Sequence, residues 1–320
     1  MVHVTGDNPK HVDQVKVTPG DGIAKLVSKL GGTGFNAKRV AEACEVLHDM
    51  VCDADCTKIM TLAGAMVPAG MRAIISDFIS NGFVDVLVTT GANLTHDVIE
   101  ALGCHHLQGS QAADDRSLLE HGTNRIYDVF MPNESYETLE DFIQDLIFDK
   151  EMPLVDFLDF LGREMERLAP GNVQDSIIRN CHLKGVPIFC PAFTDCGLGV
   201  QLMLNHRGLK LDMFHDLDRF ITMAWDMENV GVFIVGGGVP KNFTFQALQF
   251  SPNSATRAVQ VTMDRPEPGG LSGASLDEAI SWGKVNPDAA HVTVVCDATI
   301  FLPLALAYLL DLQDGSMDGE

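Results

Sequence analysis

Basic residues are scarce in this chain. Lysine and arginine together number 22 among 320 residues, against 44 aspartate and glutamate residues, and the formal net charge is −22. Because proteins that bind nucleic acid carry a basic surface, no nucleic-acid partner is expected. A negatively charged cleft concentrates cations, so the acid excess fits a cationic partner, and it also fits a role in solubility or salt tolerance alone.

Long apolar runs are missing as well. The longest candidate, residues 298–310, is shorter than the roughly 18 apolar residues that a membrane-spanning helix needs, and it contains Pro303. The opening Met-Val-His-Val-Thr-Gly-Asp has neither the basic stretch nor the apolar stretch of a secretory signal. No membrane partner is therefore expected.

Closely spaced cysteines are few. Of eight cysteines only Cys52 and Cys56 lie close together, and no second close pair completes a four-ligand zinc site. Several of the others lie in apolar runs, which predicts buried, reduced thiols in a cytoplasmic protein. Adjacent His105 and His106 lack an acidic ligand cluster, so we expect surface or helix-cap roles for them and no metal site.

Two common catalytic motifs are absent. The chain has no Walker A lysine motif and no G-x-S-x-G, which disfavours P-loop phosphoryl transfer and hydrolysis by an elbow serine.

The pattern that is present predicts an N-terminal arm and one α/β domain. Residues 1–20 are polar and contain Pro9 and Pro19, which is typical of a flexible arm. Residues 21–320 are predicted to form a single domain that begins with two helices, separated by a glycine-rich break near residue 32.

Short apolar runs and helical stretches then alternate along the chain. The predicted strands are 58–62, 84–90, 186–191, 230–235, 258–263 and 292–296. The predicted helices between them include 69–81, 94–102, 136–148, 154–168 and 216–228. Continuous apolar strands separated by helices indicate a Rossmann-like, doubly wound fold, with a mainly parallel sheet and helices on both faces.

Each predicted strand ends in small, polar or acidic residues. In an open parallel sheet, ligands bind outside the carboxyl ends of the strands, so these ends are candidates for one site. Glycine and aspartate are also ordinary turn residues, and the pattern alone leaves both interpretations open. Gly236-Gly237-Gly238 would let a phosphate approach the backbone, but it is not the full dinucleotide fingerprint.

The segment around Lys284 is the most specific feature. Glu278 and Trp282 are four residues apart, which places them on one helix face, and Lys284 follows a glycine at the predicted helix end. A lysine shielded by an aromatic ring can form a Schiff base. Alternatively, Lys284 is a cation at the helix C-terminus and Trp282 belongs to the core.

This segment, Glu-Ala-Ile-Ser-Trp-Gly-Lys, resembles the hallmark of the deoxyhypusine synthase family, E-A-[VI]-S-W-G-K. Further blocks resemble that family in the family's order, over about residues 20–310. They include Gly-Thr-Gly-Phe at 32–35, Pro-Ala-Phe-Thr-Asp at 191–195 and Gly-Gly-Gly-Val at 236–239.

The resemblance implies a Rossmann-like homotetramer that binds NAD between paired subunits. It implies oxidation of spermidine beside its secondary amine, transfer of an aminobutyl unit to an enzyme lysine, and delivery of that unit to a lysine of a translation factor. By resemblance, Lys284 is the covalent lysine, Trp282 packs on the polyamine and Glu278 holds an ammonium group. The implied NAD contacts are Thr90, Gly91, Ala92, Asp195, Gly199, Gly236, Gly238, Asp264 and Asp297.

Four positions depart from the family pattern. Asn242 replaces the histidine that usually shuttles a proton, and asparagine is no general base. Leu271 and Val200 replace acidic residues, and His96 replaces a glutamate and is a candidate for the proton-transfer role. Each lost carboxylate removes about 1–3 kcal/mol of attraction for an ammonium group. The donor therefore stays open between spermidine held differently and a shorter or less charged amine.

Other functions stay open at this point. The acceptor could be a small diamine, as in homospermidine synthesis. Some relatives hydrolyse guanidino amines such as agmatine, which would require an activated water. The chain could also be a non-catalytic regulatory subunit, because the acid–base position is altered.

Overall fold

The computed structural model describes residues 10–314. Residues 1–9 of the predicted arm lie outside the described residues, and residues 10–20 are exposed and form no helix or strand. The backbone N–H of Asp13 nevertheless donates a 2.8 Å hydrogen bond to the carbonyl of Gly32. Across residues 10–314, none of the helices has the length and apolar character required to cross a bilayer.

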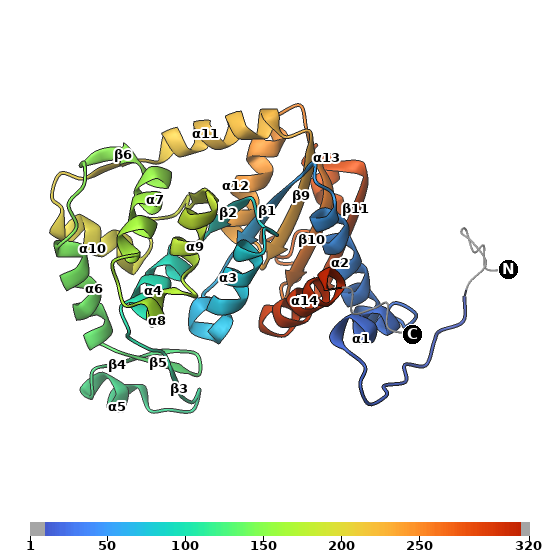
Figure 1. The fold of residues 1–320 in the computed structure, drawn as a ribbon, viewed down its shortest axis with the longest axis horizontal. Helices are drawn as coiled ribbons and strands as arrows, with labels where there is room; N and C mark the ends of the chain where they lie inside the picture. Colours follow the sequence, from blue (N-terminus) through green and yellow to red (C-terminus); the bar gives the residue numbers. More distant parts are fainter. Residues whose placement is uncertain (1–9, 315–320) are drawn as a thin grey trace.

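A six-stranded parallel sheet forms the centre of the molecule (Figure 1). The order across it is β11-β10-β9-β1-β2-β7. Its strands are β1 (Cys56–Leu62), β2 (Val86–Thr89), β7 (Ile188–Phe189), β9 (Asn229–Val235), β10 (Ala255–Thr262) and β11 (Val285–Val295). Each contains or overlaps one of the predicted strands. The chain winds outward from β1 through β2 and β7, then returns and winds the other way from β9, so the order reverses between β1 and β9.

Helices cover both faces of this sheet, as predicted. One face packs against α2 (Phe35–Cys52), α3 (Arg72–Ser80), α9 (Ile177–Lys184) and α14 (Ala298–Gln313). The other face packs against α11 (Met213–Asp226), α12 (Gly238–Gln249) and α13 (Leu276–Ser281). The remaining helices are α1 (Ile23–Leu30), η1 (Val67–Met71), α4 (Gly91–Ala101), α5 (Asp115–Glu120), α6 (Glu134–Gln144), α7 (Leu154–Met165), α8 (Pro170–Val173) and α10 (Gly197–Asn205).

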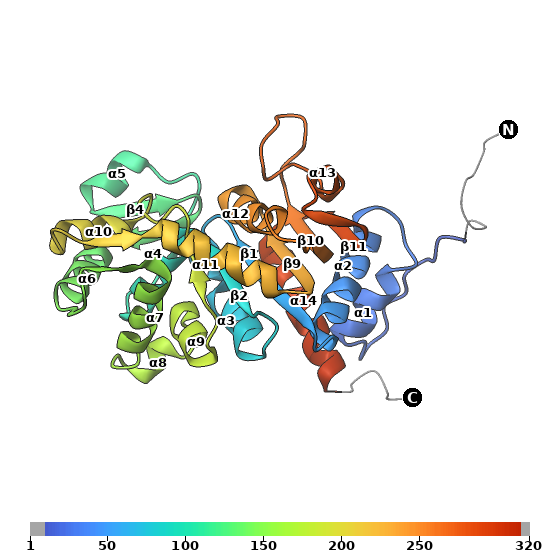
Figure 2. The ribbon, with the colours of Figure 1, turned by 90° about the horizontal axis from the view of Figure 1, so that it is seen from above.

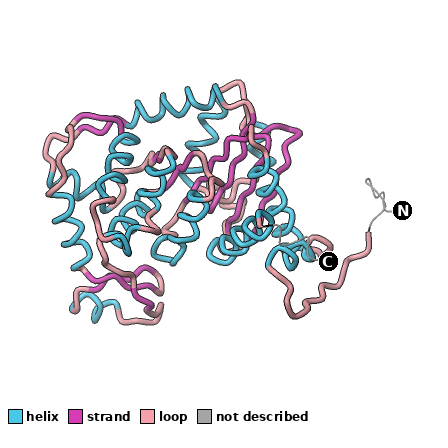
Figure 3. Tube along the Cα trace, viewed as in Figure 1, coloured by secondary structure: helices cyan, strands magenta, loops and turns pink. Residues whose placement is uncertain are grey.

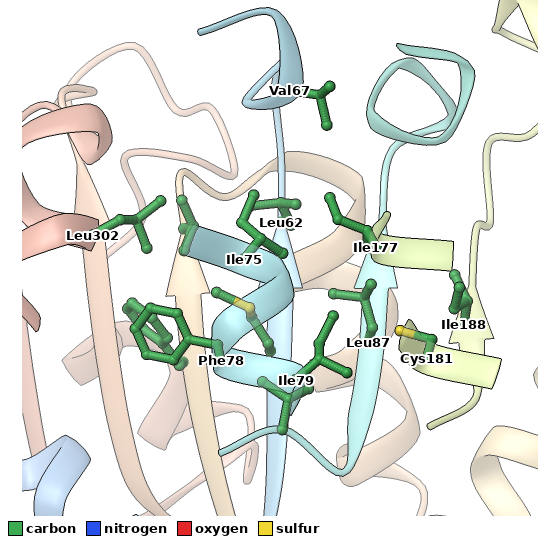
Figure 4. Packing of buried hydrophobic residues seen from close by; sticks show 14 of the residues in the cluster. Leu62, Val67, Ile75, Phe78, Ile79, Leu87, Ile177, Cys181, Ile188 and Leu302 are labelled. Atoms are coloured by element: carbon green, nitrogen blue, oxygen red, sulfur yellow. The ribbon is translucent and has the colours of Figure 1, made fainter. Parts of the chain in front are cut away.

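Successive strand residues point to opposite faces, and this places apolar side chains in two cores. Ile59 belongs to one core and its neighbour Met60 to the other. Figure 4 shows Ile75 of α3 lying beside Leu62 at the end of β1. The ring of Phe78, on the same helix, lies 5.8 Å from that of Phe233 of β9, centroid to centroid. Burial of each such side chain contributes about 1.5–3 kcal/mol. These contacts fix the sheet whose carboxyl edge carries the candidate residues.

Two small sheets lie outside the central one and were not predicted. Strands β3 (Leu107–Gln108), β4 (Thr123–Ile126) and β5 (Val129–Pro132) form an antiparallel sheet, and β6 (Glu151–Pro153) pairs with β8 (Lys210–Asp212). Figure 3 shows the three-stranded sheet at the lower left, away from the central sheet. These strands are two to four residues long and mostly not buried, so they lack the apolar runs that revealed the central strands.

A buried carboxylate joins α7 to α11 and provides a stability test. Asp216 is 4% exposed and its Oδ1 accepts the Val155 N–H at 3.1 Å. Burial raises the pKa of Asp216 to about 6. The folded state therefore binds this proton more tightly than the unfolded state, and the stabilisation from protonated Asp216 is lost as the pH rises through 6.

Asp216→Asn keeps an acceptor for Val155 and removes the buried charge. We expect a gain in unfolding free energy of about 2–3 kcal/mol at pH 8 and roughly half that at pH 5. Thermal unfolding at both pH values measures it. Asp218→Asn, on the exposed side of the same helix, is the matched control. An equal gain at both pH values would contradict the assignment.

Candidate active site

A groove of about 330 Å³ lies between α12 and α13. Five residues that the sequence singled out line it: Asn242, Leu271, Glu278, Trp282 and Lys284. It follows α12 from Lys241 to Gln249, which is about 12 Å along the helix axis. The structure thus brings the predicted covalent lysine and the predicted substrate contacts into one groove.

Helix α13 positions its functional side chains through its two ends. At its start, Ser275 Oγ accepts the Glu278 N–H at 3.1 Å, which places Glu278 in the first turn. At its end, Gly283 adopts a φ of +69°, a conformation that favours glycine. The chain then turns into β11, and the Lys284 N–H donates to the Ala279 carbonyl at 3.1 Å.

Lys284 and Trp282 meet at the mouth of the groove. Lys284 Nζ lies 5.0 Å from the centroid of the indole ring, within the range of a cation–π contact. Trp282 is 57% exposed, so the alternative that placed it in the core is wrong. Lys284 is half-buried. The indole ring therefore lies beside the amine, and both side chains line the groove.

Charge in the groove is positive within one chain. Its lining residues include two lysines, Lys241 and Lys284, and one carboxylate, Glu278. Burial lowers the pKa of Lys241 to about 8; the charge of Lys284 acts in the same direction and that of Glu278 opposes it.

The predicted cofactor residues gather around the point where the strand order reverses. Thr90 follows β2, and its Oγ1 donates to the Gly64 carbonyl, just past β1, at 2.8 Å. Gly236 follows β9 with a φ of +81°, and a side-chain carbon there would lie 3.1 Å from Ala63 Cβ. Gly91 opens α4, Gly238 opens α12, and neither helix has a side-chain cap. Their first N–H groups are therefore available to an anion.

The other cofactor candidates lie at the neighbouring strand ends. Asp264 follows β10, and Asp297 follows β11 and caps α14 by accepting the Thr299 N–H at 2.8 Å. Asp195 lies in the turn between β7 and α10. Gly199 is required by packing, because a side-chain carbon there would lie 2.4 Å from the Phe193 carbonyl oxygen.

Comparison with known proteins settles the family. The deoxyhypusine synthase family model matches residues 25–309. The chain belongs to the deoxyhypusine synthase family. It is 43% identical to "Probable deoxyhypusine synthase 1" of Methanosarcina acetivorans over 301 residues, 92% of this chain and 93% of that protein. It is 42% identical to the protein of the same name from Archaeoglobus fulgidus, covering 94% of this chain and 98% of that one.

The fold comparison agrees. A crystal structure of an Entamoeba histolytica protein that carries the deoxyhypusine synthase name superposes with a TM-score of 0.61. It is 21% identical and the match covers 90% of this chain and 93% of the other, which supports the shared fold alone.

A histidine cluster lies at α4 and just after it. His96 does not line the groove; its Nδ1 is 2.9 Å from His106 Nε2, and His106 Nδ1 is 2.6 Å from Glu100 Oε1. Burial, followed by the neighbouring His106, lowers the pKa of His96 to about 4. The His106 side chain is only 7% exposed, so the expectation of a surface or cap role is wrong for His106. His105, at 64% exposure, does lie at the surface.

Several residues of the deoxyhypusine synthase groove were missed in the sequence. Gln246, Gln249 and Ser275 line it, and their polar side chains carry no motif. Lys241 also lines the groove, and it is hydrogen-bonded to Gln260, which is buried and does not line it. The one available signal was the position of Lys241, three residues after the glycine triplet that ends β9.

Proposed function

We propose that this protein is an NAD-dependent transferase that moves an aminobutyl group from spermidine or a related amine to a lysine side chain. The observation that carries the proposal is the Lys284 amine, 5.0 Å from the Trp282 ring centroid, in a groove shared with Glu278. Membership of the deoxyhypusine synthase family supports the reaction class.

The residues at the strand ends fit NAD. Uncapped helix starts at Gly91 and Gly238 suit a pyrophosphate, and a side-chain carbon at Gly238 would meet nothing within 4 Å. Thr90, Gly236, Asp264 and Asp297 line the same edge and would hold the ribose and base portions. When bound, NAD would accept a hydride from the donor amine and return it at the end of the cycle.

Lys284 would form the covalent bond. After the donor is oxidised beside its secondary nitrogen, the unprotonated Lys284 Nζ attacks the imine carbon. The carbon–nitrogen bond to the departing amine breaks, that amine takes up the proton, and the aminobutyl carbon remains as an imine on Nζ. An acceptor lysine repeats the same exchange and releases Lys284 unchanged.

Trp282 and Glu278 would orient the donor. The exposed indole ring would attract an ammonium group by about 0.5–2 kcal/mol, and Glu278 in the same groove offers a carboxylate. One carboxylate against two lysines does not balance a polycation, so carboxylates from a second copy would complete the binding of spermidine. We propose a homotetramer in the cytoplasm, with a lysine-bearing translation factor as acceptor.

Trapping and product analysis test the proposal. The protein is incubated with NAD and labelled spermidine, putrescine or agmatine, with and without a protein acceptor, then reduced with borohydride. We expect label on Lys284 in the mapped peptide, and transfer to the acceptor lysine. Release of urea from agmatine would indicate a hydrolase, homospermidine would indicate a small acceptor, and activation of a paralogue by an inert chain would indicate a regulatory subunit. Urea release, homospermidine formation or activation of a paralogue, each observed without label on Lys284, would overturn the proposal.

Replacing Trp282 tests the aromatic contact. Trp282→Leu keeps an apolar side chain and removes the ring that faces Lys284. We expect the KM for the donor amine to rise about 3- to 30-fold, which is the range of a lost cation–π contact. Steady-state kinetics measures it, with Trp225→Leu as the control because Trp225 is equally exposed at 57% and lies outside the groove. An unchanged KM would contradict the role.

A further inference from the structure

The loop from Met263 to Ser275 joins β10 to α13 and forms part of the groove wall. Leu271 and Ala274 of this loop line the groove, and Ser275 caps the helix that carries Glu278 and Trp282. In Figure 2 the loop projects beyond α12 and α13. The position of the loop therefore sets the position of α13 and of the groove residues that follow.

Lys241 of α12 holds this loop through hydrogen bonds to its backbone. It is 4% exposed, and Nζ donates to the carbonyls of Ala274 at 2.6 Å and Leu271 at 3.3 Å, and to Gln260 Oε1 at 3.0 Å. An ammonium group has three N–H bonds, and each of these has an acceptor. The ion pairs that lysines make within residues 10–314 involve other lysines, and no carboxylate lies within ion-pair distance of Lys241. Two of its donors bind loop carbonyls and the third binds Gln260 of β10.

Gln260 completes the attachment from β10. Its side chain is fully buried, and Nε2 donates to the Ser272 carbonyl at 2.8 Å and to the Gly236 carbonyl at 3.3 Å. The two side chains thus bind three loop carbonyls, those of Leu271, Ser272 and Ala274, and connect them to the end of β9.

The backbone of the loop packs closely against the residues that follow β9 and against itself. A side-chain carbon at Gly237 would lie 2.5 Å from Ser272 Cα, and one at Gly273 would lie 1.9 Å from the Arg265 carbonyl oxygen. Both distances are too short for a carbon atom, so only glycine permits this approach. The loop therefore contacts the glycine-rich end of β9 directly and closes on itself at its base.

We propose that Lys241 and Gln260 form a clamp that fastens residues 265–275 to the sheet and holds the groove in the geometry in which Lys284 reacts. Both are positioning residues for the proposed transferase reaction, and the inference rests on that function for its kinetic consequence. The clamp predicts a coupled effect, because both side chains hold the same segment. Burial of the Lys241 ammonium group without a paired carboxylate costs free energy, because the group loses its hydration in the folded state.

The test uses Lys241→Met, Gln260→Leu and the double variant of the full chain. We expect amide hydrogens in residues 271–275 to exchange at least 10-fold faster in each single variant, with exchange in β1 and β9 unchanged. We expect kcat for transfer, and the yield of borohydride-trapped Lys284, to fall at least 30-fold, while the Kd for NAD changes less than 3-fold. The kcat of the double variant should be no more than 3-fold below that of the less active single variant. Lys38→Met, at an exposed ion pair on α2, is the matched control.

A second variant keeps the test decisive if Lys241→Met does not fold. Gly273→Ala displaces the same loop with Lys241 and Gln260 intact, and it should show the same faster exchange and the same fall in kcat. Unchanged loop exchange in the folded variants, or fully multiplicative losses in the double variant, would overturn the clamp. If the wild-type chain transfers no amine at all, the proposed function fails, whereas the exchange measurements still decide the clamp.

Discussion

Lys284→Arg is expected to abolish aminobutyl transfer, with a fall in product formation of at least about 10³-fold, as for other enzymes that lose their nucleophile. Arginine keeps the positive charge and a stacking contact with Trp282, but its guanidinium does not lose a proton under any condition that the folded protein survives. No covalent imine can therefore form at this position. Formation of NADH from the donor amine should persist at a measurable rate, because that oxidation does not require the Lys284 bond. Product mass spectrometry and NADH absorbance report the two steps separately.

Lys38→Arg is the control for this experiment. Lys38 is exposed on α2 and pairs with Glu42 at 3.4 Å, remote from the groove, so the same exchange of side chains there should leave transfer unchanged. Retention of more than a tenth of the wild-type transfer rate in Lys284→Arg would show that another nucleophile carries the aminobutyl group.

Asn242→His is expected to raise the transfer rate about 10²-fold, which is the lower end of what a general acid–base contributes. Asn242 lines the groove from the second turn of α12, but its amide cannot accept and release a proton near neutral pH. A histidine with an ordinary pKa near 6.5 titrates in the working range. The rate of the variant should therefore rise with pH through about 6.5, and this limb should be absent from the wild-type profile.

Gln246→His provides the matched comparison. Gln246 lies one turn further along α12 and also lines the groove, so this variant introduces the same imidazole at a different point. A similar gain from both variants would mean that any groove histidine suffices, and no gain from Asn242→His would mean that the proton moves through another group.

Much of the central fold could be predicted because its signals are local. A strand buried on both faces needs an apolar run, and β9 has one at 232–235, followed by glycine. In β1 the run is shorter, because Thr61 separates Ile59 and Met60 from Leu62. The boundaries were less certain: β7 is only Ile188–Phe189 within a predicted run of 186–191. The β3–β5 sheet was missed because its short, half-exposed strands depend on pairing partners rather than on their own apolar pattern.

The candidate site was predictable where a motif places residues at helical spacing. Glu278 lies in α13 and Trp282 follows its last residue, and both line the groove with Lys284, which comes after the turn. The exposure of Trp282 was not decided by the sequence, because the same spacing also allowed a position in the core. The pairing of Lys241 with Gln260 was also hidden: a lysine on α12 and a glutamine inside β10 meet only after α12 packs onto the sheet.

The length of the groove has a consequence for inhibitor chemistry. The groove runs along α12 for about 12 Å but has a volume of only about 330 Å³, so its cross-section is small. A compact fused-ring scaffold would fill one end of the groove and leave water in the rest of it. Slender, unbranched compounds with an electrophile placed to reach Lys284 are the better starting point, and lengthening such a series one methylene at a time should reveal an optimum.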